Sequence, residues 1–542
     1  MATHRYPFTA LRNPVLVIIV LLFVLLSAGS AVRESLTYDE IVHIEEGMNA
    51  WKNHTFAVDT NNPPLIRELA VLPLLLLPKE SGLQTPNIAA LPARLVIVLL
   101  GVCLVVLMYR ASTLFLDKRI ALAVIFLLVF EPNVLANSHY VTLDIGFTLF
   151  FVWAYFRLLA FLKKQTVRNA VFFGITFGLA SAAKVTALPF MIATAAILLF
   201  GRYRNDVRKL VTKNVRLSII CIAVASLAIW STYFFRTDVV IAQREDATRL
   251  SSRLHAITKE RNLPILENVI VFGESQKLPL GNYLAVIKNT IIRSSNAQAL
   301  YFFGRPYTRS MWYFMPINTI LKLPIPLILL SLVGFVMLLR TNKGKLLELS
   351  APIFGIFLVT STSGIPPYVR FVLSAIPFVV LIAGFGASYF FKGRRRLILV
   401  IFFIWYLVGT VAQYPHFISY ANEFAGPMNT RFENFLDSNI DWGQGLVTLH
   451  TYVLGTRPER VTLSYFGRDD AAAYGFPSTV PWGSYKFEEI CAFHDITNRY
   501  GDNPPLTIVS VSNWYYCGYY RQDEFARERI ADVVADAFLV FR

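Results

Sequence analysis

The sequence predicts a polytopic α-helical membrane protein that carries a small extracytoplasmic α/β domain at its C-terminal end. Of the 542 residues, 55% are hydrophobic, and the mean hydropathy is +0.50. This composition is too apolar for a soluble chain of this length. The sequence also contains eleven separate apolar runs, most of them near the roughly 20 residues that cross a bilayer as a helix.

We predict that each apolar run is a membrane helix. The first run follows a short basic N-terminus and has no convincing small-residue cleavage site, so we expect a retained signal anchor. The predicted spans cover residues 15–32, 94–110, 120–136, 141–162, 170–183, 185–200, 217–235, 317–339, 349–362, 371–391 and 397–413.

Lys and Arg residues cluster in every second connection between these runs. Basic loops stay on the cytoplasmic side, so the pattern predicts a cytoplasmic N-terminus and a C-terminus outside the plasma membrane. Segments 33–92, 236–315 and 414–542 would then lie outside. The net charge of +16 is explained by these loops and by contact with anionic headgroups, so no nucleic-acid partner is predicted.

Residues 1–413 are predicted to form the transmembrane domain, and residues 414–542 a separate outer domain. The outer domain is expected to hold a helix over 437–454 and strands over 461–466, 506–511 and 538–541. Cys491 and Cys517 fall in the compartment where oxidation is expected, which predicts a disulfide; two buried free thiols are the alternative. Cys103 and Cys221 lie inside predicted spans and are expected to be small core residues.

Ionisable residues gather at the predicted outer ends of the spans, where they are costly and often functional. The stretch 37–69 begins with acidic residues directly after the first span. Its polar part ends at an Asn-Pro-Pro turn, and an apolar part follows. Each residue also has an ordinary explanation: helix capping for the first acids, a satisfied helix-end acid in the fourth span, and snorkelling for the lysine. The residues concerned are Asp39, Glu40, His43, Asn62, Arg67, His139, Asp144, Lys184 and Arg370.

Several motifs carry a resemblance to a known family. They are the Asp39-Glu40 pair, the Asn-Pro-Pro-Leu turn, SHYVTLDIGF, GLASAAKVTALP, RSMWYFMPINTILKLPIPLILL, PPYVRFVLSAIPFVVLIAG, ISYANEFAGP and DSNIDWGQGL. With these motifs the chain resembles the membrane glycosyltransferases of the C fold class. Within that class it is similar to the protein O-mannosyltransferase and lipid A aminoarabinose transferase group, in particular the bacterial phospholipid-carrier-dependent glycosyltransferases.

The resemblance implies transfer of a hexosyl or pentosyl group from a polyprenyl-phosphate donor to an acceptor hydroxyl on the outer face, with inversion. The acceptor could be protein, lipid or polysaccharide. The first-loop acid of the family corresponds to Asp39. Many relatives have His-Pro-Pro where this chain has Asn62-Pro63-Pro64, which argues against a metal at this turn. No cofactor is therefore assigned, and a divalent metal stays open.

The expected chemistry agrees with this distribution of residues. A carboxylate within hydrogen-bond reach can act as a general base on a sugar hydroxyl, and Asp39 is the first choice, with Glu40 and Asp144 as competitors. Cations stabilise the departing phosphate. Lys184 and Arg370 are the candidates, with Arg67 or Lys322 in addition, and His43 could orient Asp39.

Two other classes of protein are alternatives. A transporter would place ionisable residues near the bilayer midplane and would show pseudo-repeats, and the sequence displays neither. A membrane-anchored carbohydrate-binding envelope protein would use the aromatic tail, whose residues could equally be ordinary core. These are Trp442, Trp482, Trp514, Tyr515, Tyr516, Tyr519 and Tyr520.

Overall fold

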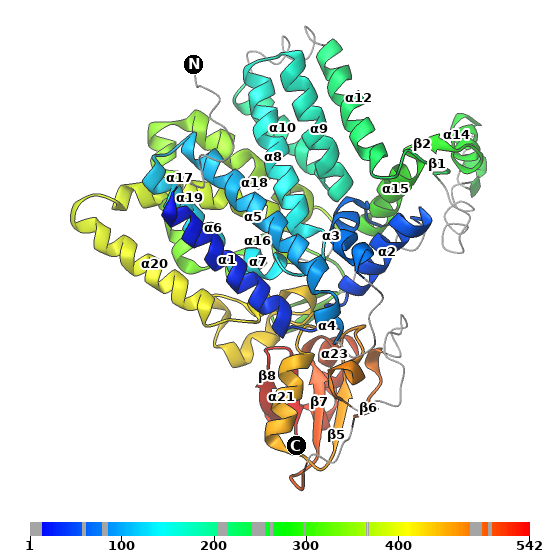
Figure 1. Ribbon diagram of the computed structural model, residues 1–542, viewed down its shortest axis with the longest axis vertical. Helices are drawn as coiled ribbons and strands as arrows, with labels where there is room; N and C mark the ends of the chain where they lie inside the picture. Colours follow the sequence, from blue (N-terminus) through cyan, green and yellow to red (C-terminus); the bar gives the residue numbers. More distant parts are fainter. Residues whose placement is uncertain are drawn as a thin grey trace.

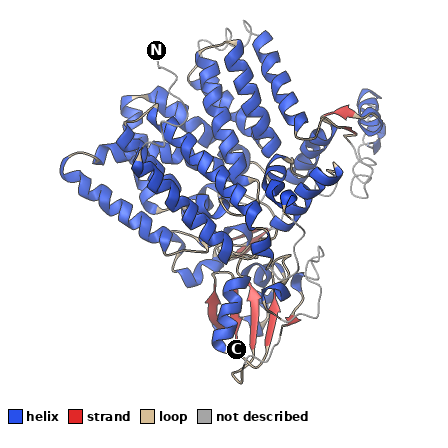
Figure 2. Cartoon of the chain, viewed as in Figure 1, coloured by secondary structure: helices blue, strands red, loops and turns tan. Residues whose placement is uncertain are grey.

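The computed structural model shows a helical bundle with a β-sheet attached at one end (Figure 1). Figure 2 shows that the strands are concentrated in this sheet, apart from two short two-stranded sheets. The first described residues lie at the opposite end of the bundle from the sheet. The structure describes residues 13–56, 61–77, 85–203, 215–240, 255–256, 258–260, 264–295, 300–364, 366, 368–476, 490–496 and 501–542.

Every predicted apolar run forms a helix or a broken pair of helices. Eight runs form single helices: α1 (Pro14–Arg33), α5 (Leu91–Thr113), α8 (Asp144–Lys163), α9 (Val167–Ala183), α10 (Ala187–Gly201), α12 (Val215–Ser231), α18 (Lys343–Ser361) and α20 (Arg396–Val411). Three runs are broken: α6 (Lys118–Val129) with α7 (Pro132–Asn137), α16 (Phe314–Lys322) with α17 (Ile325–Thr341), and the 3-10 helix η2 (Val369–Ala375) with α19 (Ile376–Phe390).

By length and composition, five helices of the described chain can cross a membrane, or six if α16 and α17 count as one bent span. Helices α9, α10 and α12 are apolar but shorter. The chain is thus a multi-pass membrane protein, and the total of eleven spans stays a prediction.

Prolines mark the breaks in the long apolar runs. A proline ring cannot donate a backbone hydrogen bond and restricts the residue before it, so proline tends to begin a new helix. Pro132 begins α7, Pro324 precedes α17 where the chain bends by 114°, and Pro377 lies in the first turn of α19. Two of these helix ends meet inside the protein, where the Asn133 amide donates to the Lys322 carbonyl at 2.8 Å. Polar groups therefore collect at these breaks.

The segments between the long helices contain shorter elements. Helix α2 (Glu40–Asn53) packs on α3 (Leu65–Leu76), and the two approach closely at Gly47, where a Cβ would lie 2.6 Å from the Arg67 carbonyl. The remaining elements are α4 (Pro86–Ala89), β1 (Thr237–Asp238), α14 (Pro264–Ser275), β2 (Leu278–Pro279), α15 (Gly281–Ser295), β3 (Leu300–Phe302) and β4 (Arg305–Tyr307).

The C-terminal segment contains a five-stranded mixed sheet in the order β6-β5-β7-β9-β8, in which only β5 and β7 run parallel. Alternate residues of β9 face opposite sides, as strand geometry requires. Phe538 and Val540 pack with α21, whereas Leu539 and Phe541 pack with the segment before it. The elements are α21 (Leu446–Thr456), β5 (Val461–Ser464), β6 (His494–Asp495), β7 (Leu506–Ser510), α23 (Val511–Tyr516), β8 (Ile530–Val534) and β9 (Phe538–Phe541).

One expectation about this segment and one about the cysteines of the helical bundle are corrected, and the expected disulfide is confirmed. The predicted helix over 437–454 begins only at Leu446, because the preceding residues form a tight loop that is hydrogen-bonded to other parts of the chain. Cys103 is exposed on the outward side of α5 rather than in the core, while Cys221 is buried. Cys491 and Cys517 form the predicted disulfide.

Candidate active site where the bundle meets the C-terminal sheet

The segment after α1 is held against the C-terminal part of the chain by backbone hydrogen bonds. Ser35 N donates to the Gln444 carbonyl at 3.0 Å, and Tyr38 N donates to the Trp442 carbonyl at 2.8 Å. Leu36 N donates to the Asp469 carboxylate at 2.9 Å. These bonds place the next residue, Asp39 at the start of α2, between the helical bundle and the sheet.

Asp39 forms an ion pair with Arg370, a residue 331 positions away in the sequence. Arg370 Nη1 lies 2.8 Å from Asp39 Oδ2. The Asp39 side chain keeps 32% of its surface exposed, against 15% for Arg370. A carboxylate at a helix start that remains partly accessible can meet a substrate, whereas a fully enclosed one cannot.

The surroundings of Asp39 favour its ionised form. Burial alone would raise the pKa of this carboxyl group, but the positive charges of Arg370, His43 and Arg468 outweigh it. The pKa of Asp39 therefore lies below its ordinary value. His43 stands one turn further along α2 and is buried, so the expectation that it tunes Asp39 agrees with its position.

Asp144 and Lys184 form a second carboxylate–cation pair. Lys184 follows α9 and its Nζ lies 2.6 Å from Asp144 Oδ1 at the start of α8. The ammonium group also lies 5.1 Å from the ring centre of Phe371, the neighbour of Arg370. The charges of both Asp39 and Asp144 act on Arg370. The structure thus brings Asp39, Asp144, Lys184 and Arg370 together, as expected from the sequence.

Glu40 is buried, and both of its carboxylate oxygens are hydrogen-bonded within the protein. Arg94 binds both of its carboxylate oxygens, at 2.9 Å through Nε and 2.7 Å through Nη2. Thr37 N donates to the same carboxylate at 2.8 Å, and so does Val141 N. The Thr37 hydroxyl also donates to this carboxylate, at 3.1 Å. This network favours a structural role for Glu40 rather than that of a base.

His139 is also enclosed, in a cluster around Glu34. The Glu34 carboxylate lies 2.6 Å from His139 Nε2 and 2.9 Å from His416 Nδ1, and it accepts from the Tyr140 hydroxyl at 2.7 Å. Burial disfavours the charge, but the hydrogen bonds with the two histidines outweigh it and lower the pKa of Glu34 to about 2. His139 therefore ties α1 to the bundle and does not face Asp39.

Lys322 serves the loop before α21. Its Nζ donates to the carbonyl oxygens of Ile418 at 2.8 Å and Asn439 at 2.6 Å, and the side chain is completely buried. Because Lys322 makes these hydrogen bonds, it holds the backbone of the loop before α21 and does not present its charge to a phosphate. The remaining candidates lie around α3. Arg67 is buried, and its Nη1 lies 3.9 Å from Glu46 Oε2, whereas Asn62 is partly exposed just before the helix.

Three residues from the C-terminal part of the chain complete the site. The Trp442 ring lies under Arg370, with 4.3 Å from Cζ to the ring centre. Arg468 lies 4.1 Å above the Tyr38 ring, and its charge reaches Asp39. Asp437 adopts a left-handed backbone conformation and interacts electrostatically with Arg370. Sequence reasoning singled out DSNIDWGQGL as a motif but did not place Asp437 or Trp442 at the site.

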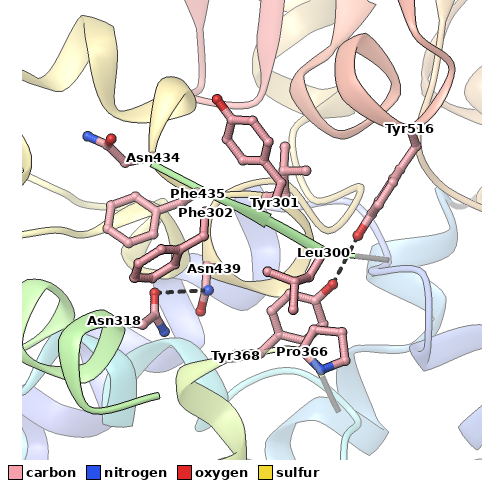
Figure 3. A pocket seen from close by; sticks show the side chains of 11 residues that line it. Leu300, Tyr301, Phe302, Asn318, Pro366, Tyr368, Asn434, Phe435, Asn439 and Tyr516 are labelled. Atoms are coloured by element: carbon pink, nitrogen blue, oxygen red, sulfur yellow. Dashed lines mark hydrogen bonds between the residues drawn. The ribbon is translucent and has the colours of Figure 1, made fainter. Parts of the chain in front are cut away.

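A pocket lies next to this site, between β3 and the loop before α21 (Figure 3). It contains about 290 Å³ of space not filled by atoms. The Tyr368 and Tyr516 hydroxyls pair at 2.9 Å, the Asn439 amide donates to Asn318 at 3.3 Å, and the Tyr301 hydroxyl donates to the Glu433 carbonyl. Because these polar groups already have hydrogen-bond partners within the protein, we do not assign a ligand to this pocket.

The aromatic tail is largely core. Trp442 and Trp514 are only 2% and 4% exposed, and Tyr519 is buried as well. Trp482 lies outside the described residues. A carbohydrate-binding face needs accessible aromatic rings, so these buried residues do not support that alternative. Among the residues that the structure describes, no group of three or more His, Cys, Asp or Glu side chains could hold a metal ion.

Known proteins share sequence features and the overall fold with this chain. Residues 87–230, from α4 to α12, match the family model described as dolichyl-phosphate-mannose-protein mannosyltransferase. The structure of ArnT from Cupriavidus metallidurans bound to undecaprenyl phosphate is similar to this chain with a TM-score of 0.50 and 10% sequence identity, over 97% of each chain. The chain has the GT-C fold of membrane glycosyltransferases.

The GT-C fold confirms the class expected from the sequence motifs. The apo structure of ArnT aligns with 13% identity and a TM-score of 0.49, covering 71% of this chain and 61% of that one. Comparison with curated proteins gives no match. Because the identities are low, the structural similarity shows the fold alone, and the reaction rests on the site itself.

Proposed function

We propose that this chain transfers a sugar from a polyprenyl-phosphate donor to an acceptor hydroxyl, with inversion at the anomeric carbon. The observation that carries the proposal is the meeting of two carboxylate–cation pairs, Asp39–Arg370 and Asp144–Lys184, at the same end of a GT-C helical bundle. ArnT, which shares the fold, has been solved in complex with undecaprenyl phosphate. The family model matched by residues 87–230 is described as a dolichyl-phosphate-mannose-protein mannosyltransferase.

In the proposed reaction the acceptor oxygen attacks the anomeric carbon while the bond from this carbon to the phosphate oxygen breaks. The hydroxyl proton passes to Asp39, and the bonding electron pair leaves with the polyprenyl phosphate. Arg370 and Lys184 face the phosphate and stabilise the charge that develops on it. Asp144 holds Lys184 in place. Sugar transfer by the purified protein, measured with and without a chelator, tests whether a divalent metal is needed.

A transporter is the second class to weigh. It requires ionisable groups arranged around a central pathway. Here the acids and cations lie at helix ends, and Trp442 in the loop before α21 lies against Arg370. This placement favours a reaction at the membrane surface over passage through the bilayer.

Deletion of the gene, followed by mass spectrometry of envelope glycans and glycolipids, tests the proposed function. We expect polyprenyl-phosphate sugar to accumulate and one sugar to disappear from a product. Purified full-length protein should then restore the transfer. An unchanged glycan and lipid profile after deletion would contradict the proposal. The same spectra identify the sugar and show whether the acceptor is protein, lipid or polysaccharide.

We further propose that the site lies on the outer side of a bacterial inner membrane. The support is the alternation of basic connections along the chain. Topology reporters fused after Arg204 and after Tyr420 are expected to lie on opposite sides of the membrane, with the second outside. Finding both reporters on one side would rule out this orientation.

The Asp39–Arg370 pair predicts a distinctive pH dependence. While Arg370 pairs with Asp39, it holds the carboxyl pKa below its ordinary value, together with His43 and Arg468. A bound donor phosphate competes for the same guanidinium, so the pKa of Asp39 rises in the complex. Activity requires the carboxylate and is lost as pH falls through this pKa. The acid limb of kcat should therefore lie at higher pH than that of kcat/KM, because these report the complex and the free enzyme respectively. Coincident limbs would contradict this coupling.

A further inference from the structure

Arg370 packs against flat aromatic surfaces in addition to its ion pair with Asp39. Its guanidinium carbon lies 4.3 Å from the Trp442 ring centre and 5.2 Å from that of Phe371. One nitrogen, Nη1, is bonded to Asp39, and no described residue accepts a hydrogen bond from Nε. The orientation of the guanidinium plane therefore depends on stacking, for which arginine is well suited because its group is planar and weakly hydrated.

Trp442 is itself fixed from several directions. It is 2% exposed, its carbonyl accepts from Tyr38 N at 2.8 Å, and its own N–H donates to Gln444 Oε1 at 2.7 Å. The next residue, Gly443, has a φ of +90°, and a Cβ there would lie 2.9 Å from the Phe466 carbonyl. The chain can therefore turn sharply here, close against Phe466, which follows β5.

The loop that carries Trp442 also touches the other parts of the site. Asn439 accepts from Lys322 Nζ through its backbone carbonyl and from Val369 N through its side chain at 3.0 Å. Ser35 Oγ, just before Asp39, donates to the Gly443 carbonyl at 2.8 Å. Residues 437–444 thus bind both segments that carry the ion pair, the one before α2 and the one at η2.

We propose that Trp442 is a positioning residue through which the C-terminal domain holds Arg370 in the orientation that binds the donor phosphate. The inference deepens the proposed function and rests on it. On this view the domain that follows the membrane helices is a working part of the active site. Trp442 acts on the donor only through the guanidinium, so its effect disappears when Arg370 is absent.

A double-mutant cycle tests the proposal in the purified full-length protein, with undecaprenyl phosphate as the probe in an equilibrium binding assay. Trp442→Leu should weaken binding about tenfold, the order expected for a desolvated cation–π contact, and Trp442→Phe should weaken it much less. In an Arg370→Ala background Trp442→Leu should have no further effect, because the partner is gone. Equal losses of affinity in both backgrounds would overturn the proposal.

Trp514→Leu is the matched control. Trp514 is equally buried in the same domain, where its indole donates to the Phe525 carbonyl at 2.9 Å, but it does not contact Arg370. Its loss should lower stability while undecaprenyl phosphate affinity stays parental. Arg370→Lys removes the planar group without changing the buried loop, so it should weaken binding to the same degree as Trp442→Leu. Failure of the parental protein to bind the probe would instead contradict the proposed function.

Discussion

Asp39→Asn should lower kcat by about 10²–10⁴-fold and leave undecaprenyl phosphate binding within a few-fold of the parental value. Asparagine has the shape of aspartate, and its amide oxygen can still accept from Arg370 Nη1, which lies 2.8 Å from the native carboxylate. The amide cannot take the proton of the acceptor hydroxyl. Sugar transfer and binding are measured on the same purified protein, so that the chemical step and the donor site are separated.

Two further substitutions give this result its meaning. Glu45→Gln removes an acid of the same charge from the exposed face of α2 and should leave transfer unchanged. Asp144→Asn disrupts the pair with Lys184 at 2.6 Å and should weaken donor binding more than it lowers kcat. If Asp39→Asn transfers sugar at the parental rate and Asp144→Asn does not, Asp144 is the base.

Arg94→Ala should destabilise the protein by about 3–5 kcal/mol, because it leaves the carboxylate of Glu40 buried without its partner. Arg94 is completely buried near the start of α5. It donates to the carbonyls of Ala31, Glu34 and Ser35 at 2.7, 2.8 and 2.8 Å, in addition to its paired bonds with Glu40. This one side chain therefore hydrogen-bonds backbone carbonyl groups at the C-terminal end of α1 and positions the residues that lead to Asp39.

Thermal unfolding of the detergent-solubilised protein measures this effect. Arg110→Ala serves as the control, since Arg110 lies in the last turn of the same helix at its other end. The melting temperature of Arg94→Ala should fall well below that of Arg110→Ala. Equal melting temperatures would show that the buried network around Glu40 adds little to stability.

Local composition was enough to predict the helices, the disulfide and four residues of the candidate site. Apolar runs near the length of a membrane crossing form helices wherever they lie, and prolines end them. Cys491 and Cys517 fall in one segment of the sequence, apart from the other two cysteines, and they form the disulfide. Asp39, Asp144, Lys184 and Arg370 stood out because ionisable groups at membrane helix ends need partners, and the structure pairs them with one another.

The division of labour among the polar residues depends on contacts between distant parts of the chain. Glu40 and Lys322 look like good candidates in the sequence, but Arg94 and two backbone carbonyls consume their hydrogen-bonding capacity. Asp39 keeps an accessible face although it is the immediate neighbour of Glu40, because α2 begins between them and turns the two side chains apart. Trp442 reaches Arg370 only after the C-terminal sheet docks on the bundle. Hydropathy and charge act locally and can be read from the sequence, whereas which buried group pairs with which is decided by the packing of segments hundreds of residues apart.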